Sequence, residues 1–111
     1  MINAAATIGD LIWYASEERI FIWDSSKDLN QIKTVTSSHT QFVNHLHSNS
    51  HSMYSFGKDK IMARYSDDKE VAKTTLNAGA KAVSVDESLV VVLTFQDELA
   101  IFDAKDLQPK F

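Results

Sequence analysis

The stretch "RIFIWDSSKD", residues 19–28, decides the fold class of this chain. It is rich in residues that suit a pleated sheet, ends its apolar run on a Trp-Asp pair and then turns polar. Successive side chains in a strand point to opposite faces, so "RIFIW" places two isoleucines on one face and Phe21 with Trp23 on the other. Apolar side chains on both faces are typical of a strand whose sheet is stacked between two others.

The same pattern occurs three times, at an interval of about 40 residues. "DKIMARYSDDK" ends its strand at Tyr65 and "DELAIFDAKD" ends its strand at Phe102, as the first stretch does at Trp23. A tight polar turn precedes each aromatic, and a β-prone run precedes that turn: "LIWYA", "SMYSF" and "LVVVLTF". A polar loop follows each aromatic and leads to a further run: "QIKTVTS", "EVAKTTL" and, cut short, "LQPKF". The repeat unit therefore holds four strands.

Four strands in about 40 residues are typical of one blade of a β-propeller. We therefore predict an all-β chain of about three four-stranded blades, at 1–37, 38–77 and 78–111. Propellers have about four to eight blades, so three leave the ring incomplete. Open sheet edges and apolar faces invite pairing. We expect the ring to need further blades, from the same protein or from a second copy.

Composition narrows the function classes. The chain has 111 residues, 44% of them apolar and 23% charged, with a net charge of −4 and no cysteine. The acidic balance gives no electrostatic basis for binding nucleic acid or an anionic membrane. The longest apolar run, at 89–95, is far shorter than the ~20 residues of a membrane helix. The first ten residues lack the basic and apolar regions of a signal peptide, so we expect a cytoplasmic protein.

The Trp-Asp ending and its analogues resemble the WD-repeat β-propeller family. The resemblance implies that two aromatic-acidic pairs anchor their blades, namely Trp23 with Asp24 and Phe102 with Asp103. The second repeat has Tyr65-Ser66 at this position but keeps other family elements, "SSHT" and "YSFGKD". Matched to the family, these elements imply a buried hydrogen-bonded relay of His39, Ser55, Asp59 and Tyr65. Because a tyrosine hydroxyl is not an indole N–H, we expect this relay to be altered or incomplete.

Within the WD-repeat family, three segments are similar to consecutive repeats of the actin-interacting protein 1 family: "SSHTQFVNHL", "KDKIMARY" and "KAVSVDESLVVVLTFQDELAIFD". That family joins two propellers and promotes the disassembly of cofilin-decorated actin filaments. The resemblance implies actin and cofilin as partners. No surface motif in the chain is specific enough to assign actin contacts.

Neither a metal site nor an active site is expected. His45 and His47 share a strand face at a spacing at which a metal can bind, with His51 close by, but there is no cysteine and no near carboxylate. No serine sits in a Gly-x-Ser-x-Gly elbow, and the three glycines are too far apart for a phosphate loop. Paired carboxylates fall in predicted turns. We therefore predict no enzyme activity and no cofactor.

The partner is expected to be a protein. Lys58 and Lys60 make the one locally basic turn, and Phe42 enters the second blade at the position most suited to an exposed rim. These three residues are the candidate partner contacts. The favoured function is a non-catalytic scaffold that binds proteins through its rim loops. The alternative is a structural subunit that serves as a packing block in a large assembly.

Overall fold

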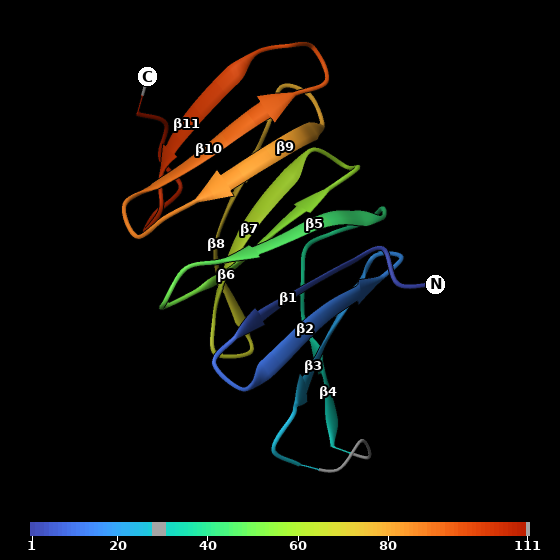
Figure 1. Cartoon of the computed structure of the whole chain (residues 1–111). Helices are drawn as coiled ribbons and strands as arrows, with labels where there is room; N and C mark the ends of the chain where they lie inside the picture. Colours follow the sequence, from blue (N-terminus) through green and yellow to red (C-terminus); the bar gives the residue numbers. More distant parts are fainter. Residues whose placement is uncertain (28–30, 111) are drawn as a thin grey trace.

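The computed structural model describes residues 1–27 and 31–110, and it consists of three antiparallel sheets stacked in chain order (Figure 1). Sheet 1 has the order β1 (Ala4–Ile8), β2 (Leu11–Ser16), β3 (Arg19–Asp24), β4 (Ile32–Val35). Sheet 2 has the order β5 (Val43–Ser48), β6 (Met53–Gly57), β7 (Ile61–Ser66), β8 (Lys69–Thr75). Sheet 3 contains β9 (Ala80–Val85), β10 (Leu89–Thr94) and β11 (Leu99–Asp103).

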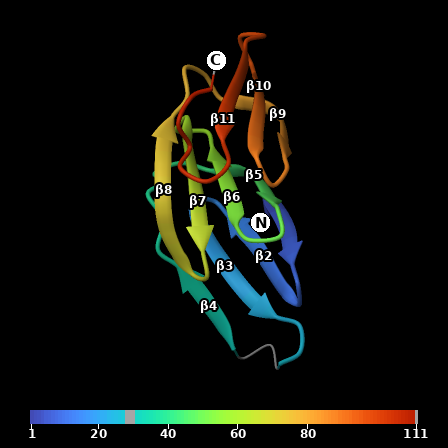
Figure 2. The same cartoon turned by 90° about the vertical axis from the view of Figure 1, so that its left-hand side faces the viewer.

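The strands follow one another in each sheet in the same direction. In Figure 2, β4, β8 and β11 lie toward one side of the stack, and β5 and β9 lie toward the other. Contacts between sheets concentrate on the first strands, because β5 packs against β1 and β2 on one side and against β9 on the other. The sheets therefore converge at their first strands and splay toward their last, as blades do around an axis.

Sheet 3 differs from the prediction of four strands per blade, because it has three. Up to Lys110, where the described residues end, the predicted fourth run reaches β11 through a single bridge between Phe102 and Pro109. Two backbone hydrogen bonds flank this bridge, from Asp103 N–H to the Gln108 carbonyl and from Lys110 N–H to the Ile101 carbonyl. These two bonds make Phe102 and Pro109 a non-hydrogen-bonded pair, so the position of the missing Pro109 N–H faces away from β11. Phe111 and residues 28–30 of the predicted first loop lie outside the described residues.

Two apolar cores lie between the sheets. The first core joins one face of sheet 1 to sheet 2 and includes Trp13, Ile20, Met53 and Tyr65, with the Trp13 and Tyr65 rings 5.5 Å apart. The second core joins the other face of sheet 2 to sheet 3. It contains Tyr54, Phe56, Met62, Leu76, Ala80, Val90, Val92, Phe102, Ala104 and Leu107. Sheet 2 is thus covered on both faces.

The prediction of an all-β chain with three open, propeller-type sheets is confirmed. The predicted boundaries at 37/38 and 77/78 fall in the connections between the sheets. Residues 1–27 and 31–110 contain no helix of the length and apolarity needed to cross a membrane.

Candidate functional site

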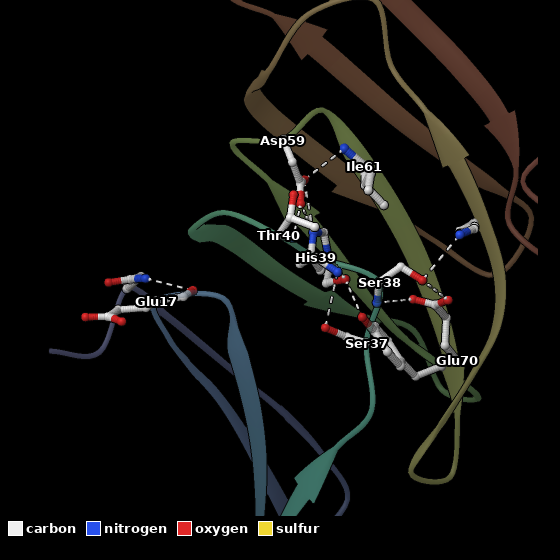
Figure 3. A network of polar contacts seen from close by, with 12 residues as sticks. Glu17, Ser37, Ser38, His39, Thr40, Asp59, Ile61 and Glu70 are labelled. Atoms are coloured by element: carbon white, nitrogen blue, oxygen red, sulfur yellow. Dashed lines mark hydrogen bonds and ion pairs between the residues drawn. The ribbon is translucent and has the colours of Figure 1, made fainter.

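The structure brings the four residues of the predicted relay together in sheet 2. His39 comes from the connection between β4 and β5, Ser55 from β6, Asp59 from the β6–β7 turn and Tyr65 from β7. His39 Nδ1 lies 3.1 Å from Asp59 Oδ1, and His39 Nε2 lies 2.6 Å from Ser55 Oγ. Ser55 Oγ lies 2.9 Å from the Tyr65 hydroxyl. Figure 3 shows the His39 ring directed at the Asp59 carboxylate.

The chemistry of the end groups fixes the direction of these hydrogen bonds. An ionised carboxylate only accepts, so His39 Nδ1–H donates to Asp59. In the neutral imidazole His39 Nε2 then accepts, and its donor is the Ser55 hydroxyl. Ser55 Oγ in turn accepts from the Tyr65 O–H. The tyrosine hydroxyl therefore occupies the donor position that an indole N–H would otherwise fill.

Asp59 joins the relay to the backbone on both sides of it. Its carboxylate accepts from Thr40 N–H at 2.7 Å and from Ile61 N–H at 3.1 Å, in addition to His39 (Figure 3). Burial by itself would raise the Asp59 pKa, but the Thr40, Ile61 and His39 donors outweigh it and hold the pKa below its ordinary value. Asp59 is therefore a charged acceptor at neutral pH.

Two features of this site were missed from the sequence. A Cβ on Gly57 would collide with Asp59 Oδ1 and His39 Nδ1, so only glycine leaves room for their contact. Beside the relay, Ser38 donates its N–H and its hydroxyl to the two oxygens of Glu70, at 3.0 and 2.6 Å (Figure 3). Gly57 stands next to a polar turn in the sequence, and this position could have indicated that another group approaches the backbone closely. The pairing of Ser38 with Glu70 was not, because it depends on the register of β8.

The relay contains a Ser-His-Asp sequence of contacts, the order found in serine hydrolases. Ser55 is 0% exposed and His39 6% exposed, and the Tyr65 hydroxyl binds the serine oxygen. No substrate can reach a nucleophile in this position. Burial also raises the pKa of Tyr65, which keeps its hydroxyl protonated as a donor. The arrangement suits a structural lock that ties the β4–β5 connection to β6 and β7.

The other aromatic positions of the repeat lie in different surroundings. Trp23 is half-buried, and its Nε1–H donates to the Lys27 carbonyl at 3.3 Å. Phe102 is buried in the second core and has no hydrogen-bonding group. By strand register, Tyr14 in sheet 1 and Val92 in sheet 3 stand where Ser55 stands in sheet 2. Val92 has no hydrogen-bonding side chain, and the Tyr14 ring stacks on Phe21 with ring centres 5.2 Å apart.

The acidic partners of these aromatics cap turns. Asp24 Oδ1 accepts from the N–H and the hydroxyl of Ser26, at 3.0 and 2.6 Å, and these bonds lower its pKa. Asp103 Oδ1 accepts from Lys105 N–H at 2.8 Å, and that bond is the main cause of its lowered pKa. Both carboxylates thus hold the loop that follows their strand.

The three candidate partner contacts lie together at one end of sheet 2. Phe42 is 49% exposed, and its carbonyl accepts from Lys58 N–H at 2.8 Å. The Lys58 and Lys60 side chains are both exposed, and Lys60 has a positive φ of 69°. The Thr40–Asp59 hydrogen bond links the same two loops. The relay therefore lies directly beneath this surface, which we call the rim: Phe42, Lys58 and Lys60.

The remaining histidines do not converge on one point. His45 Nε2–H donates to the Ala80 carbonyl at 3.1 Å, and the His45 and His47 ring centres are 6.1 Å apart. Burial, and then the nearby His45, lower the pKa of His47. His51 Nε2 lies 3.7 Å from Glu87. Over residues 1–27 and 31–110 there is no group of three or more His, Asp or Glu placed to hold a metal ion.

Solved structures share this fold. The WD40 repeats of RRP9 superpose with a TM-score of 0.82 at 10% sequence identity, over 99% of this chain and 37% of that one. The chain has the fold of part of a WD40 propeller. The computationally designed protein Ika4 gives a TM-score of 0.88 at 16% identity, over 100% of this chain and 71% of that one.

A second designed protein, Ika8, gives a TM-score of 0.88 at 16% identity, over 99% of this chain and 35% of that one. The chain thus spans about a third of the Ika8 and RRP9 chains. No protein-family model matches it, and no curated protein does. At these identities the likeness shows the fold alone, and these neighbours give no support for the actin-interacting type.

Proposed function

We propose that this chain is a non-catalytic propeller segment of the WD-repeat type that acts as a protein–protein interaction scaffold. The observation that carries the proposal is the placement of the rim on the buried relay. The serine–histidine–aspartate arrangement of Ser55, His39 and Asp59 is sealed from solvent, whereas the side chains of the rim are exposed. Propeller folds of this type are typically non-catalytic, which agrees with the sealed serine.

The rim has the composition of a small binding surface. Phe42 supplies an exposed aromatic ring, and aromatic residues supply much of the binding energy in protein interfaces. Lys58 and Lys60 add two positive charges within the same two loops. The Thr40–Asp59 and Lys58–Phe42 hydrogen bonds hold these loops before binding, which lowers the entropic cost of association. The partner that fits is a protein with an apolar pocket edged by carboxylates.

The experiment compares the proteins retained from cell extract by the chain and by rim variants. A triple variant, F42A with K58E and K60E, should lose the retained partner, whereas V71A should keep it. Val71 is a suitable control because it is 49% exposed, like Phe42, but lies on β8 away from the rim. An unchanged set of partners with the triple variant would remove the rim from the proposal.

A second candidate function is a structural subunit of a large assembly, in which the sheets serve as a packing block. The uncovered apolar faces of sheets 1 and 3 favour it, because such faces are suited to permanent contacts. The two functions differ in stoichiometry. A packing block stays with its assembly through gel filtration at constant ratio, and a scaffold exchanges its partner.

A narrower form of the proposal is regulation of actin filaments together with cofilin, in the cytoplasm. It rests on the sequence resemblance alone. The test is co-sedimentation of the full protein with filaments, with and without cofilin. Faster filament loss with cofilin is the expected result, and no binding and no effect on filament loss would exclude the actin role.

A further inference from the structure

The two internal junctions between sheets are built in the same way. In each junction one sheet presents the face that carries its third-strand aromatic position, which we call the leading face. Tyr65 opposite Met53 marks it in sheet 2, and Phe102 opposite Val90 marks it in sheet 3. The preceding sheet presents its other face, the trailing face, which carries Trp13 in sheet 1 and Phe56 in sheet 2. Each junction thus stacks a trailing face on a leading face.

Sheet 1 has an uncovered leading face. Trp23 is opposite Ile12 and Phe21 is opposite Tyr14, which are the register positions of the leading face in sheets 2 and 3. The Tyr14 and Phe21 rings stack with centres 5.2 Å apart. None of these four side chains belongs to either of the two cores, and all are half-buried.

Sheet 3 has an uncovered trailing face, and it is aliphatic. Val91 is opposite Ile101 and Leu93 is opposite Leu99, with Leu89 at the end of the same face. These side chains also lie outside both cores, and Leu99 is 65% exposed. The chain therefore carries, at its two ends, one face of each kind that its own junctions bring together.

We propose that a second copy of this chain covers both faces. The trailing face of sheet 3 in each copy packs on the leading face of sheet 1 in the other, so that two copies close a ring of six sheets. The proposal goes beyond the scaffold function, because it concerns the end faces and not the rim. It places the Tyr14, Phe21 and Trp23 rings on a surface of valine, leucine and isoleucine, as the internal junctions place Phe56 and Tyr54 near Val90 and Val92.

Two copies give a number of sheets that suits a closed ring. Propellers have about four to eight blades, and six is the one multiple of three in that range. A head-to-tail contact that closes after two copies uses two identical interfaces and leaves neither face uncovered. Three copies would give nine sheets, outside the range.

The test is the solution mass of the chain by size exclusion with light scattering, at micromolar concentration. The expected mass is twice 12.5 kDa. F21D places a charge on the leading face and V91D places one on the trailing face, and each variant alone should be monomeric. V71D adds the same charge at an exposed position of β8 and should remain a pair. Far-ultraviolet circular dichroism and thermal unfolding check that every variant is folded.

Mixing the two end-face variants reveals the direction of the contact. A one-to-one mixture of F21D and V91D keeps one intact interface, so part of the material should return to the paired mass. If the copies met leading face to leading face, V91D would stay paired by itself, and that result would overturn the head-to-tail contact. A folded wild-type monomer, or a mass above the pair, would overturn the ring of six. The rim variants should leave the solution mass unchanged. Failure of the proposed protein-binding rim would therefore show in the retained partners, and failure of the proposed ring would show in the mass.

Discussion

Sheets 1 and 2 each end their third strand on an aromatic residue and a polar one, but the two aromatic side chains lie in different surroundings. Trp23-Asp24 in sheet 1 is the literal Trp-Asp pair, yet Trp23 is half-buried and its Nε1–H donates to the Lys27 carbonyl in the loop that follows it. Tyr65-Ser66 in sheet 2 is a divergent pair, yet the Tyr65 hydroxyl ends a buried relay of four residues. This contrast indicates that the relay depends more on the residues around the aromatic side chain than on the aromatic residue itself. Sheet 1 has Tyr14 at the position that Ser55 occupies in sheet 2.

The largest expected effect comes from Gly57→Ala. The added Cβ collides with the His39 ring and the Asp59 carboxylate, so the relay must open or β6 must shift. We expect a loss of about 3 kcal/mol in the free energy of unfolding, measured by urea denaturation. Gly79→Ala is the matched control, because its Cβ meets only the Phe95 ring at 3.5 Å. A loss in Gly79→Ala as large as that in Gly57→Ala would contradict the explanation.

Asp59→Asn should have the next largest effect. The amide keeps the shape but offers one acceptor oxygen to three donors, and it turns an N–H₂ toward the others. We expect a loss of about 2 kcal/mol, since charge-assisted bonds in a buried site are lost. Asp24→Asn is the comparison in sheet 1. The Asp24 carboxylate is exposed to solvent, so the urea midpoint of Asp24→Asn should fall less than that of Asp59→Asn.

Tyr65→Phe tests the last member of the relay. It removes one buried hydroxyl and leaves the ring in the first core, so we expect a loss of about 1 kcal/mol. Trp23→Phe removes one hydrogen bond to the following loop and keeps an aromatic ring, so it should cost no more than about 0.5 kcal/mol. Urea denaturation of both variants shows which of the two aromatic residues contributes more to the free energy of unfolding. If Trp23→Phe cost more than Tyr65→Phe, the contrast between the two sheets would be wrong.

The smallest expected effect is a change in pH dependence. The Asp59 pKa is held below its ordinary value of 3.8 in the folded chain, so its charged form stabilises the fold above that value. This contribution is lost as the pH falls through 3.8 toward the lower pKa of the folded chain. The difference in urea midpoint between pH 7 and pH 3 should therefore be smaller in Asp59→Asn than in the wild type. An equal difference would mean that Asp59 titrates alike in both states.

The alternation of apolar residues and the recurrence of the aromatic positions predicted the strands and their stacking, because both follow from local periodicity. The four members of the relay could be matched because each stands at a fixed offset within one repeat. Burial of Trp23 could not be predicted, because it depends on whether another sheet covers the leading face of sheet 1.

Residue type and position in the sequence predict Phe42, Lys58 and Lys60 as partner contacts. The structure shows in addition that the three residues lie next to one another. That proximity follows from the Lys58–Phe42 backbone bond, a long-range contact with no local sequence pattern. The role of Gly57 was missed for a similar reason. A glycine in a strand indicates a close approach of some group, but the sequence does not identify His39 and Asp59 as that group.

The covering of sheet 2 on both faces has a consequence for the order in which amide protons exchange. Opening sheet 1 or sheet 3 breaks one apolar core, whereas opening sheet 2 breaks both cores and the relay. The amides of β6 and β7 should therefore exchange only when the whole chain unfolds, and those of β1 and β11 through smaller, cheaper openings. The middle repeat would act as the cooperative unit on which the outer two assemble.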